Sequence, residues 1–216
     1  MKLPKLNRRS VLIGAGFLTF VVVAAFSLMG SVYVLHSEDP LTVSLARWMN
    51  LPVARVGTKT VSYDDYLSHL GSLRTFMSGP AAAAQGLAGT IGPNEERSAL
   101  ERAIRLSAIE EMAESAGLIA TPLDVERAYA GLIAQGSASS TPGEIQDLLR
   151  DQFGWEEKDF KEFVIRPALM EDALRAKRAR ETGDEMAFDK ELEERLKRPD
   201  VVRYLRFQSL ANQTGS

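Results

Sequence analysis

The sequence predicts a mainly α-helical fold, a helical bundle with a small N-terminal β-hairpin, preceded by one transmembrane helix. Three observations lead to this fold class. Residues 11–35 carry no charge, residues 53–61 hold two short β-prone segments around a glycine, and residues 62–198 show helical apolar spacing between repeated helix-start signals. We therefore expect one membrane anchor followed by one domain.

The uncharged run Val11–Leu35 is 25 residues long, and about 20 apolar residues span a bilayer. Residues 1–10 carry four basic side chains, and the first acid of the chain is Glu38. Because basic flanks stay in the cytoplasm, we predict a cytoplasmic N-terminus and a single-pass membrane protein whose C-terminal domain is extracytoplasmic, in the periplasm or at the cell surface. The alternative is a cleaved signal peptide, but its apolar core would hold only about 7–15 residues.

A short helix is expected in the juxtamembrane segment, residues 36–52. Asp39-Pro40 is typical of a helix start, with an N-cap followed by a first-turn proline. The bulky apolar residues after it share one helical face: Leu41, Leu45, Trp48 and Met49. This face either lies at a membrane interface or packs on the core of the domain, and the sequence leaves both interpretations open.

A β-hairpin is predicted where Val53–Val56 and Thr60-Val61 flank Gly57, because glycine readily supplies the positive φ of a tight turn. Ser62 then stands as the N-cap of a helix, with Asp65 in the capping-box position. A lone two-stranded hairpin is only marginally stable in water, so we expect it to dock on helices.

The first domain helix carries more large apolar side chains than one packing face needs. They are Tyr63, Tyr66, Leu67, Leu70, Leu73, Phe76 and Met77. We expect the C-terminal half, with Phe76 and Met77, to remain partly exposed; the alternative is that all seven are core. An uncharged loop follows over residues 78–94, with one short helical turn at its alanines, and it is either a linker or an apolar flap.

The remaining helices are predicted from caps, prolines and glycines. They cover residues 95–116, 121–135, 141 to the turn Phe153-Gly154-Trp155, 156–180 and 184–198. Pro167 should kink the fourth of these helices. Leu149 is expected in the core beneath the aromatic turn.

Composition excludes several classes of chemistry. The chain contains no cysteine and only two histidines, and no catalytic or nucleotide-binding motif occurs. We therefore predict no catalytic residue, no metal site and no cofactor. Beyond residue 10 the chain contains 22 basic and 29 acidic side chains, and this excess of acidic residues argues against nucleic-acid binding.

The segment order is an anchor, then "PVARVGTKTVSYDDYLSHL", then "ERAIRLSAIEEMAESAGLIATPLDVERAYAGL", then "TPGEIQDLLRDQFGWEEKDFKEFVIRPALMEDALRAKRA". In this order the chain resembles the N-terminal chaperone lobe of the SurA, PrsA and PpiD family of extracytoplasmic folding factors, over Val53–Arg180. Three features carry the resemblance: Gly57 in the hairpin turn, then Ala113, Gly117, Leu118 and Ala120 before Thr121, then Ile145, Leu149, Gly154, Trp155, Phe160 and Ile165.

Together with the charge, hydropathy and helix signals above, the resemblance over Val53–Arg180 divides the chain into six parts. They are a cytoplasmic N-terminus (1–10), a transmembrane helix (11–35), a juxtamembrane segment (36–52), a SurA N-terminal-like helical chaperone domain (53–182), a charged C-terminal helix (183–207) and a disordered tail (208–216). The chain departs from the family in two ways. Too few residues follow Arg180 to build the family's parvulin domain with its paired histidines, and Val56 stands where an asparagine is common.

What the resemblance implies is a membrane-anchored, non-catalytic holdase that binds unfolded or newly translocated polypeptides. Candidate client-binding residues are Tyr66, Leu70, Leu73, Phe76, Met77 and Phe163. The alternatives are an interaction subunit with one dedicated partner, such as an envelope or translocon component, and a residual peptidyl-prolyl isomerase.

Overall fold

The computed structural model describes residues 27, 29–33, 39–136, 142–205 and 207. The predicted cytoplasmic N-terminus, residues 1–10, and the predicted disordered tail, residues 208–216, lie outside these ranges.

The predicted transmembrane helix is wrong, and the single-pass localisation that depends on it is wrong with it. Within the described residues, no helix is both long enough and apolar enough to cross a bilayer. Of the run Val11–Leu35, only residues 27 and 29–33 are described, and this end packs on protein. Val32 is fully buried in the core, and the Tyr33 hydroxyl donates a 2.8 Å hydrogen bond to the Pro52 carbonyl.

The fold is mainly helical, as predicted, and includes a three-stranded antiparallel sheet in the order β2-β1-β3. The hairpin β1 (Pro52–Val56) and β2 (Lys59–Ser62) is confirmed, with Gly57 at φ +55° in its turn. The third strand, β3 (Val201–Arg203), pairs with the other edge of β1. The segment predicted as one C-terminal helix, residues 183–207, is therefore a helix followed by a strand, because the helix ends before Pro199.

The helices follow their predicted start signals closely, and proline is the first residue of five of them. Their bounds are α2 (Pro40–Trp48), α3 (Tyr63–Ser78), α4 (Pro80–Ala84), α5 (Pro93–Ser115), α6 (Pro122–Gly136), α7 (Pro142–Phe153), α8 (Glu157–Phe160), η1 (Lys161–Ile165), α9 (Arg166–Thr182) and α10 (Ala187–Lys197). Ser62 and Asp65 form the expected capping box at α3. The single helix predicted over residues 156–180 is divided into α8, the π-helical turn η1 and α9, and Pro167 is the second residue of α9.

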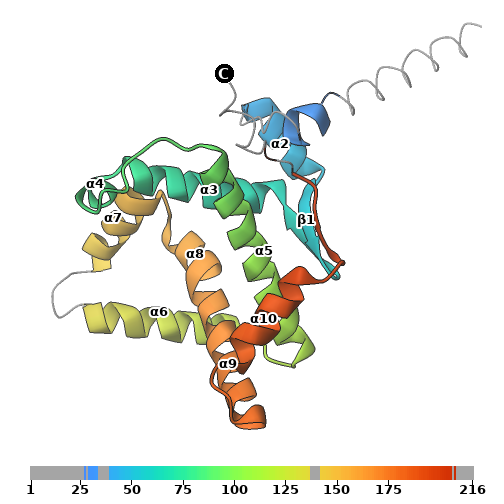
Figure 1. Ribbon diagram of the computed structural model, residues 1–216. Helices are drawn as coiled ribbons and strands as arrows, with labels where there is room; N and C mark the ends of the chain where they lie inside the picture. The colour runs from blue at the N-terminus through green and yellow to red at the C-terminus, as the bar shows by residue number, and fades with distance from the viewer. Residues whose placement is uncertain (1–26, 28, 34–38, 137–141, 206, 208–216) are drawn as a thin grey trace, which may run out of the picture.

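The core lies between the sheet and helices α3, α5, α9 and α10, and α5 packs against the sheet and against each of the other three helices (Figure 1). The largest side chains with less than 2% exposure include Tyr63, Tyr66, Leu100, Ile104, Ile109, Leu174, Phe188 and Leu192. Helix α2 joins this core through Ala46, with Val43 packed against it, but leaves its bulky apolar face in solvent. Leu41 is 75% exposed and Trp48 is 83% exposed, so the expected packing of α2 on the core is confirmed, but it does not use the face that carries these two residues.

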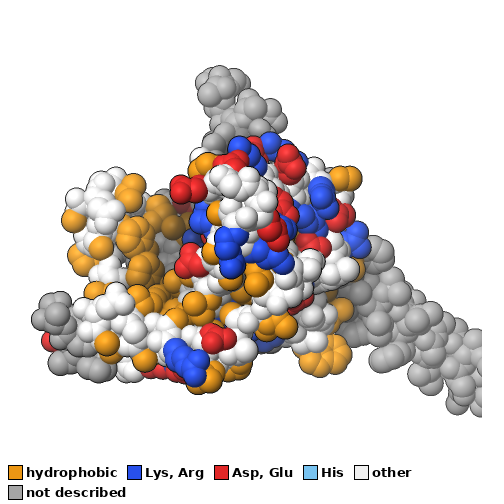
Figure 2. Space-filling model, turned by 90° about the horizontal axis from the view of Figure 1, so that it is seen from below, with side chains coloured by type: hydrophobic (Ala, Val, Ile, Leu, Met, Phe, Trp, Pro, Cys, Tyr) orange, Lys and Arg blue, Asp and Glu red, His pale blue; other side chains and the backbone are white. Residues whose placement is uncertain are grey.

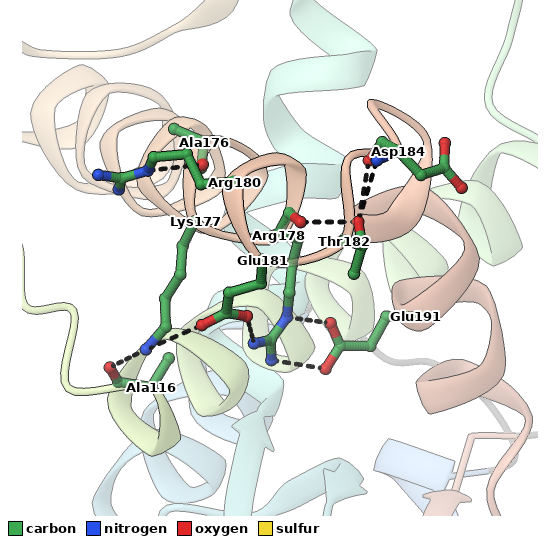
Figure 3. A network of polar contacts seen from close by, with 9 residues as sticks. All are labelled: Ala116, Ala176, Lys177, Arg178, Arg180, Glu181, Thr182, Asp184 and Glu191. Atoms are coloured by element: carbon green, nitrogen blue, oxygen red, sulfur yellow. Dashed lines mark hydrogen bonds and ion pairs between the residues drawn. The ribbon is translucent and has the colours of Figure 1, made fainter.

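Ion pairs hold the C-terminal elements to this core. The buried Arg195 of α10 donates to Glu111 of α5 at 2.6 Å and to Asp200 at 3.0 Å. Arg178 of α9 forms a two-pronged contact with Glu191 of α10, at 2.5 and 2.8 Å (Figure 3). Lys177 donates to the Ala116 carbonyl at the end of α5, where a cation is favoured by the helix dipole.

Candidate functional site

Helices α6 and α7 project as two arms on one side of the core (Figure 1). Helix α6 packs on η1, and α7 packs on α3 and α8. Hydrophobic side chains line a hollow between projecting parts of the surface, at the left of Figure 2. The arms carry exposed leucines, namely Leu123 and Leu132 on α6 and Leu148 on α7.

A row of half-buried aromatic rings crosses this side of the molecule. The Phe153 ring stacks on Phe76 with centroids 6.0 Å apart, and on Trp155 with centroids 5.2 Å apart. Trp155 in turn lies 6.5 Å from Phe160 and 6.4 Å from Phe163. We call these five residues the aromatic row; α3, α7, α8, η1 and the α7–α8 connection supply its members.

The aromatic row borders a cavity of about 450 Å³, which we call the aromatic cavity. Its lining comes from α3, α5 and the end of α7 with the residues after it: His69, Ser72, Leu73, Phe76, Ser98, Ala99, Arg102, Phe153 and Trp155. The volume falls in the range of small-molecule pockets, about 300–1,000 Å³. A second cavity of about 150 Å³ lies on the other side of His69 and is lined partly by Phe163.

The turn at Gly154, directly after α7, brings Trp155 to the wall of the aromatic cavity. Gly154 has φ +67°, a conformation that favours glycine, and this turns the chain back so that the Trp155 amide lies 3.3 Å from the Leu149 carbonyl oxygen. Leu149 is only 4% exposed, which confirms the predicted core position beneath the turn. The Trp155 indole N–H has no hydrogen-bond partner among the described residues.

His69 separates the two cavities and is uncharged at neutral pH. The pKa of His69 is lowered to about 4, mainly by burial and also by the nearby Arg102 charge, with Asp65 acting in the opposite direction. The ring meets Phe163 edge-on at 5.1 Å. The wall that His69 contributes to the aromatic cavity is therefore neutral.

The predicted client-binding residues divide into two groups. Leu73 and Phe76 line the aromatic cavity, Phe163 lines the smaller cavity, and Met77 is half-buried beside Gly89 of the following loop. Tyr66 and Leu70 are 0% and 2% exposed and belong to the main core. We therefore remove these two from the candidate set, because their face of α3 is already covered.

Of the nine residues in the cavity wall, sequence reasoning predicted only Leu73 and Phe76, and three of the missed residues matter most for binding. Phe153 and Trp155 were expected only as members of the aromatic turn above Leu149, and they also line the aromatic cavity. Arg102 had no sequence signal of its own. The nearest hint is the small pair Ser98-Ala99 one turn earlier on α5, which leaves room on that face for a cavity.

No protein-family model, curated protein or solved structure significantly matches this chain. The resemblance to the SurA, PrsA and PpiD family therefore stays a prediction.

Proposed function

We propose that this chain is a non-catalytic holdase that binds unfolded polypeptide segments in the aromatic cavity. One observation carries the proposal: half-buried aromatic rings from several elements border an open cavity of about 450 Å³. The resemblance noted above is consistent with it but is not needed for it.

Aromatic walls suit clients of varied sequence. An aromatic side chain offers 150–250 Å² of contact surface, and burial of apolar area has no directional requirement. Three side chains of the cavity wall contain no hydrogen-bonding group and offer only apolar surface: Leu73, Phe76 and Phe153. Such a wall binds large apolar side chains broadly, whereas a site for one fixed ligand would hold more convergent hydrogen-bonding groups.

The test is suppression of client aggregation by the full-length chain. Three unrelated proteins are unfolded in denaturant and diluted at 20 °C, and light scattering is followed with and without the chain. We expect all three aggregation rates to fall, and Trp155→Ala to lose most of this effect. Trp48→Ala is the matched control, because Trp48 lies on α2 and is 83% exposed, and it should act like the unmodified chain.

Two results would overturn the proposal. One is an unmodified chain that leaves all three rates unchanged or acts on a single client only, as a dedicated interaction subunit would. The other is a Trp155→Ala variant as active as the Trp48→Ala control. Circular dichroism at the assay temperature shows whether Trp155→Ala is folded. Should it be unfolded, Phe76→Leu takes its place, and a partial loss is expected because leucine offers less contact area than the ring.

A further inference from the structure

One charged side chain faces the aromatic cavity. Arg102 of α5 is exposed and lines the wall, and within the described ranges it makes no hydrogen bond or ion pair. Its neighbour one turn later is different, since Arg105 donates to Glu171 of α9 at 3.1 Å. The Arg102 guanidinium therefore retains its five donors for a bound molecule.

The charges around the two cavities differ in sign. Arg102 is the charged group in the wall of the aromatic cavity, because His69 there is neutral at pH 7. The smaller cavity beyond His69 is lined by three carboxylates, Asp65, Glu110 and Glu162, and by one guanidinium, that of Arg166. A negative group on a bound segment is thus attracted toward the Arg102 end and repelled from the other end.

We propose that the aromatic cavity prefers segments in which a large apolar side chain stands next to an Asp or Glu, whose carboxylate pairs with Arg102. This inference rests on the proposed function and names the class of segment that the cavity takes. The apolar side chain occupies the wall of Phe76, Phe153 and Trp155. The carboxylate meets the guanidinium in the planar, two-pronged geometry that arginine favours.

A preference for acidic segments would have to come from the site itself and not from the overall charge of the chain. Because the whole chain carries −3, general electrostatics disfavours an acidic segment. A preference for acid can therefore arise only from a local positive group, and it should weaken as salt screens the exposed guanidinium.

The experiment uses two fluorescent peptides with the same apolar core, containing phenylalanine and leucine, and either Glu or its uncharged isostere Gln beside each phenylalanine. Both peptides are acetylated and amidated, so that the side chains alone differ in charge. Anisotropy is measured with the full-length chain, with Arg102→Gln and with Arg97→Gln. Arg97 is the matched control, since it is an exposed arginine of the same helix outside the cavity wall.

We expect the unmodified chain and Arg97→Gln to bind the Glu peptide about three- to tenfold more tightly than the Gln peptide. Arg102→Gln should bind both peptides with the affinity of the Gln peptide, and Arg102→Lys should recover part of the difference. Equal binding of both peptides by the unmodified chain overturns this inference alone, as does equal loss in the two glutamine variants. Failure to bind either peptide overturns the proposed function as well.

Discussion

The ring of Phe76 on α3 lies parallel to the ring of Phe153 on α7, with centroids 6.0 Å apart and planes 6° apart. This stack ties the α7 arm to the body of the molecule and borders the aromatic cavity at the same place. The two rings should therefore contribute both to stability and to binding.

The stack should be measurable as a coupling energy. Phe76→Ala, Phe153→Ala and the double variant form a cycle, and the free energy of unfolding is measured by urea denaturation. We expect a coupling of about 0.5–1.5 kcal/mol, the range for aromatic pairs. Strictly additive single effects would show that the two rings do not stabilise each other.

Two adjacent leucines of α7 should respond very differently to truncation. Leu149→Ala should lower the free energy of unfolding by about 2–5 kcal/mol, because Leu149 is 4% exposed beneath the Gly154 turn. Leu148→Ala should change it by less than about 0.5 kcal/mol, because Leu148 is 55% exposed. Similar losses of unfolding free energy in the two variants would contradict the assignment of Leu149, and not Leu148, to the buried face of α7.

Alanine substitutions at two glycines should distinguish the cost of a strained backbone from the cost of a steric clash. Gly57 and Gly86 both have positive φ, but a Cβ on Gly57 would lie 2.0 Å from Glu111 Oε1, whereas the described residues leave open space at Gly86. Gly57→Ala must also displace the Glu111–Arg195 ion pair, so we expect it to lower the melting temperature well beyond Gly86→Ala. Equal decreases in melting temperature for the two variants would mean that a Cβ at residue 57 does not displace the Glu111–Arg195 ion pair.

His69 should make stability depend on pH in a known direction. Its pKa is about 4 in the folded chain and near 6.5 when unfolded, so the unfolded state binds the proton more tightly between these values. Stability from this group is therefore complete above pH 6.5 and is lost as pH falls toward 4, by up to about 1.4 kcal/mol per pH unit.

The difference between the unmodified chain and His69→Gln isolates this effect, since the carboxylates near His69 are common to both: Asp65, Glu110 and Glu162. Urea denaturation at pH 7.0, 6.0 and 5.0 should show the unmodified chain losing stability relative to His69→Gln as pH falls. Parallel pH profiles would indicate that His69 titrates normally and is not buried.

Local signals in the sequence predicted most elements correctly. Proline starts, the Ser62–Asp65 capping box and the Gly57 turn act within a few residues, and the structure confirms them. Strand β3 was missed because it forms only by pairing with β1, about 150 residues earlier in the chain.

The candidate site was predicted only in part, because its shape depends on tertiary packing. The spacing of apolar residues placed Tyr66, Leu70 and Phe76 on one helix but could not say which of them α5 and the sheet would cover. The unpaired state of Arg102 was equally invisible, since it depends on where the acids of α9 lie. The uncharged run Val11–Leu35 shows the same limit, because counting apolar residues did not reveal that Val32 is buried against the domain.

Trp155 offers the most direct test of the proposed cavity, because the chain has only two tryptophans. In a Trp48→Phe background, Trp155 is the sole indole and reports on the aromatic cavity. A permanently unfolded, tryptophan-free polypeptide is titrated into this variant while its binding is followed independently by anisotropy of a label on the polypeptide. We predict a saturable change in Trp155 emission with the same midpoint as the anisotropy curve. Binding that saturates while Trp155 emission stays constant, or no binding at all, would contradict the assignment of the aromatic cavity as the client site.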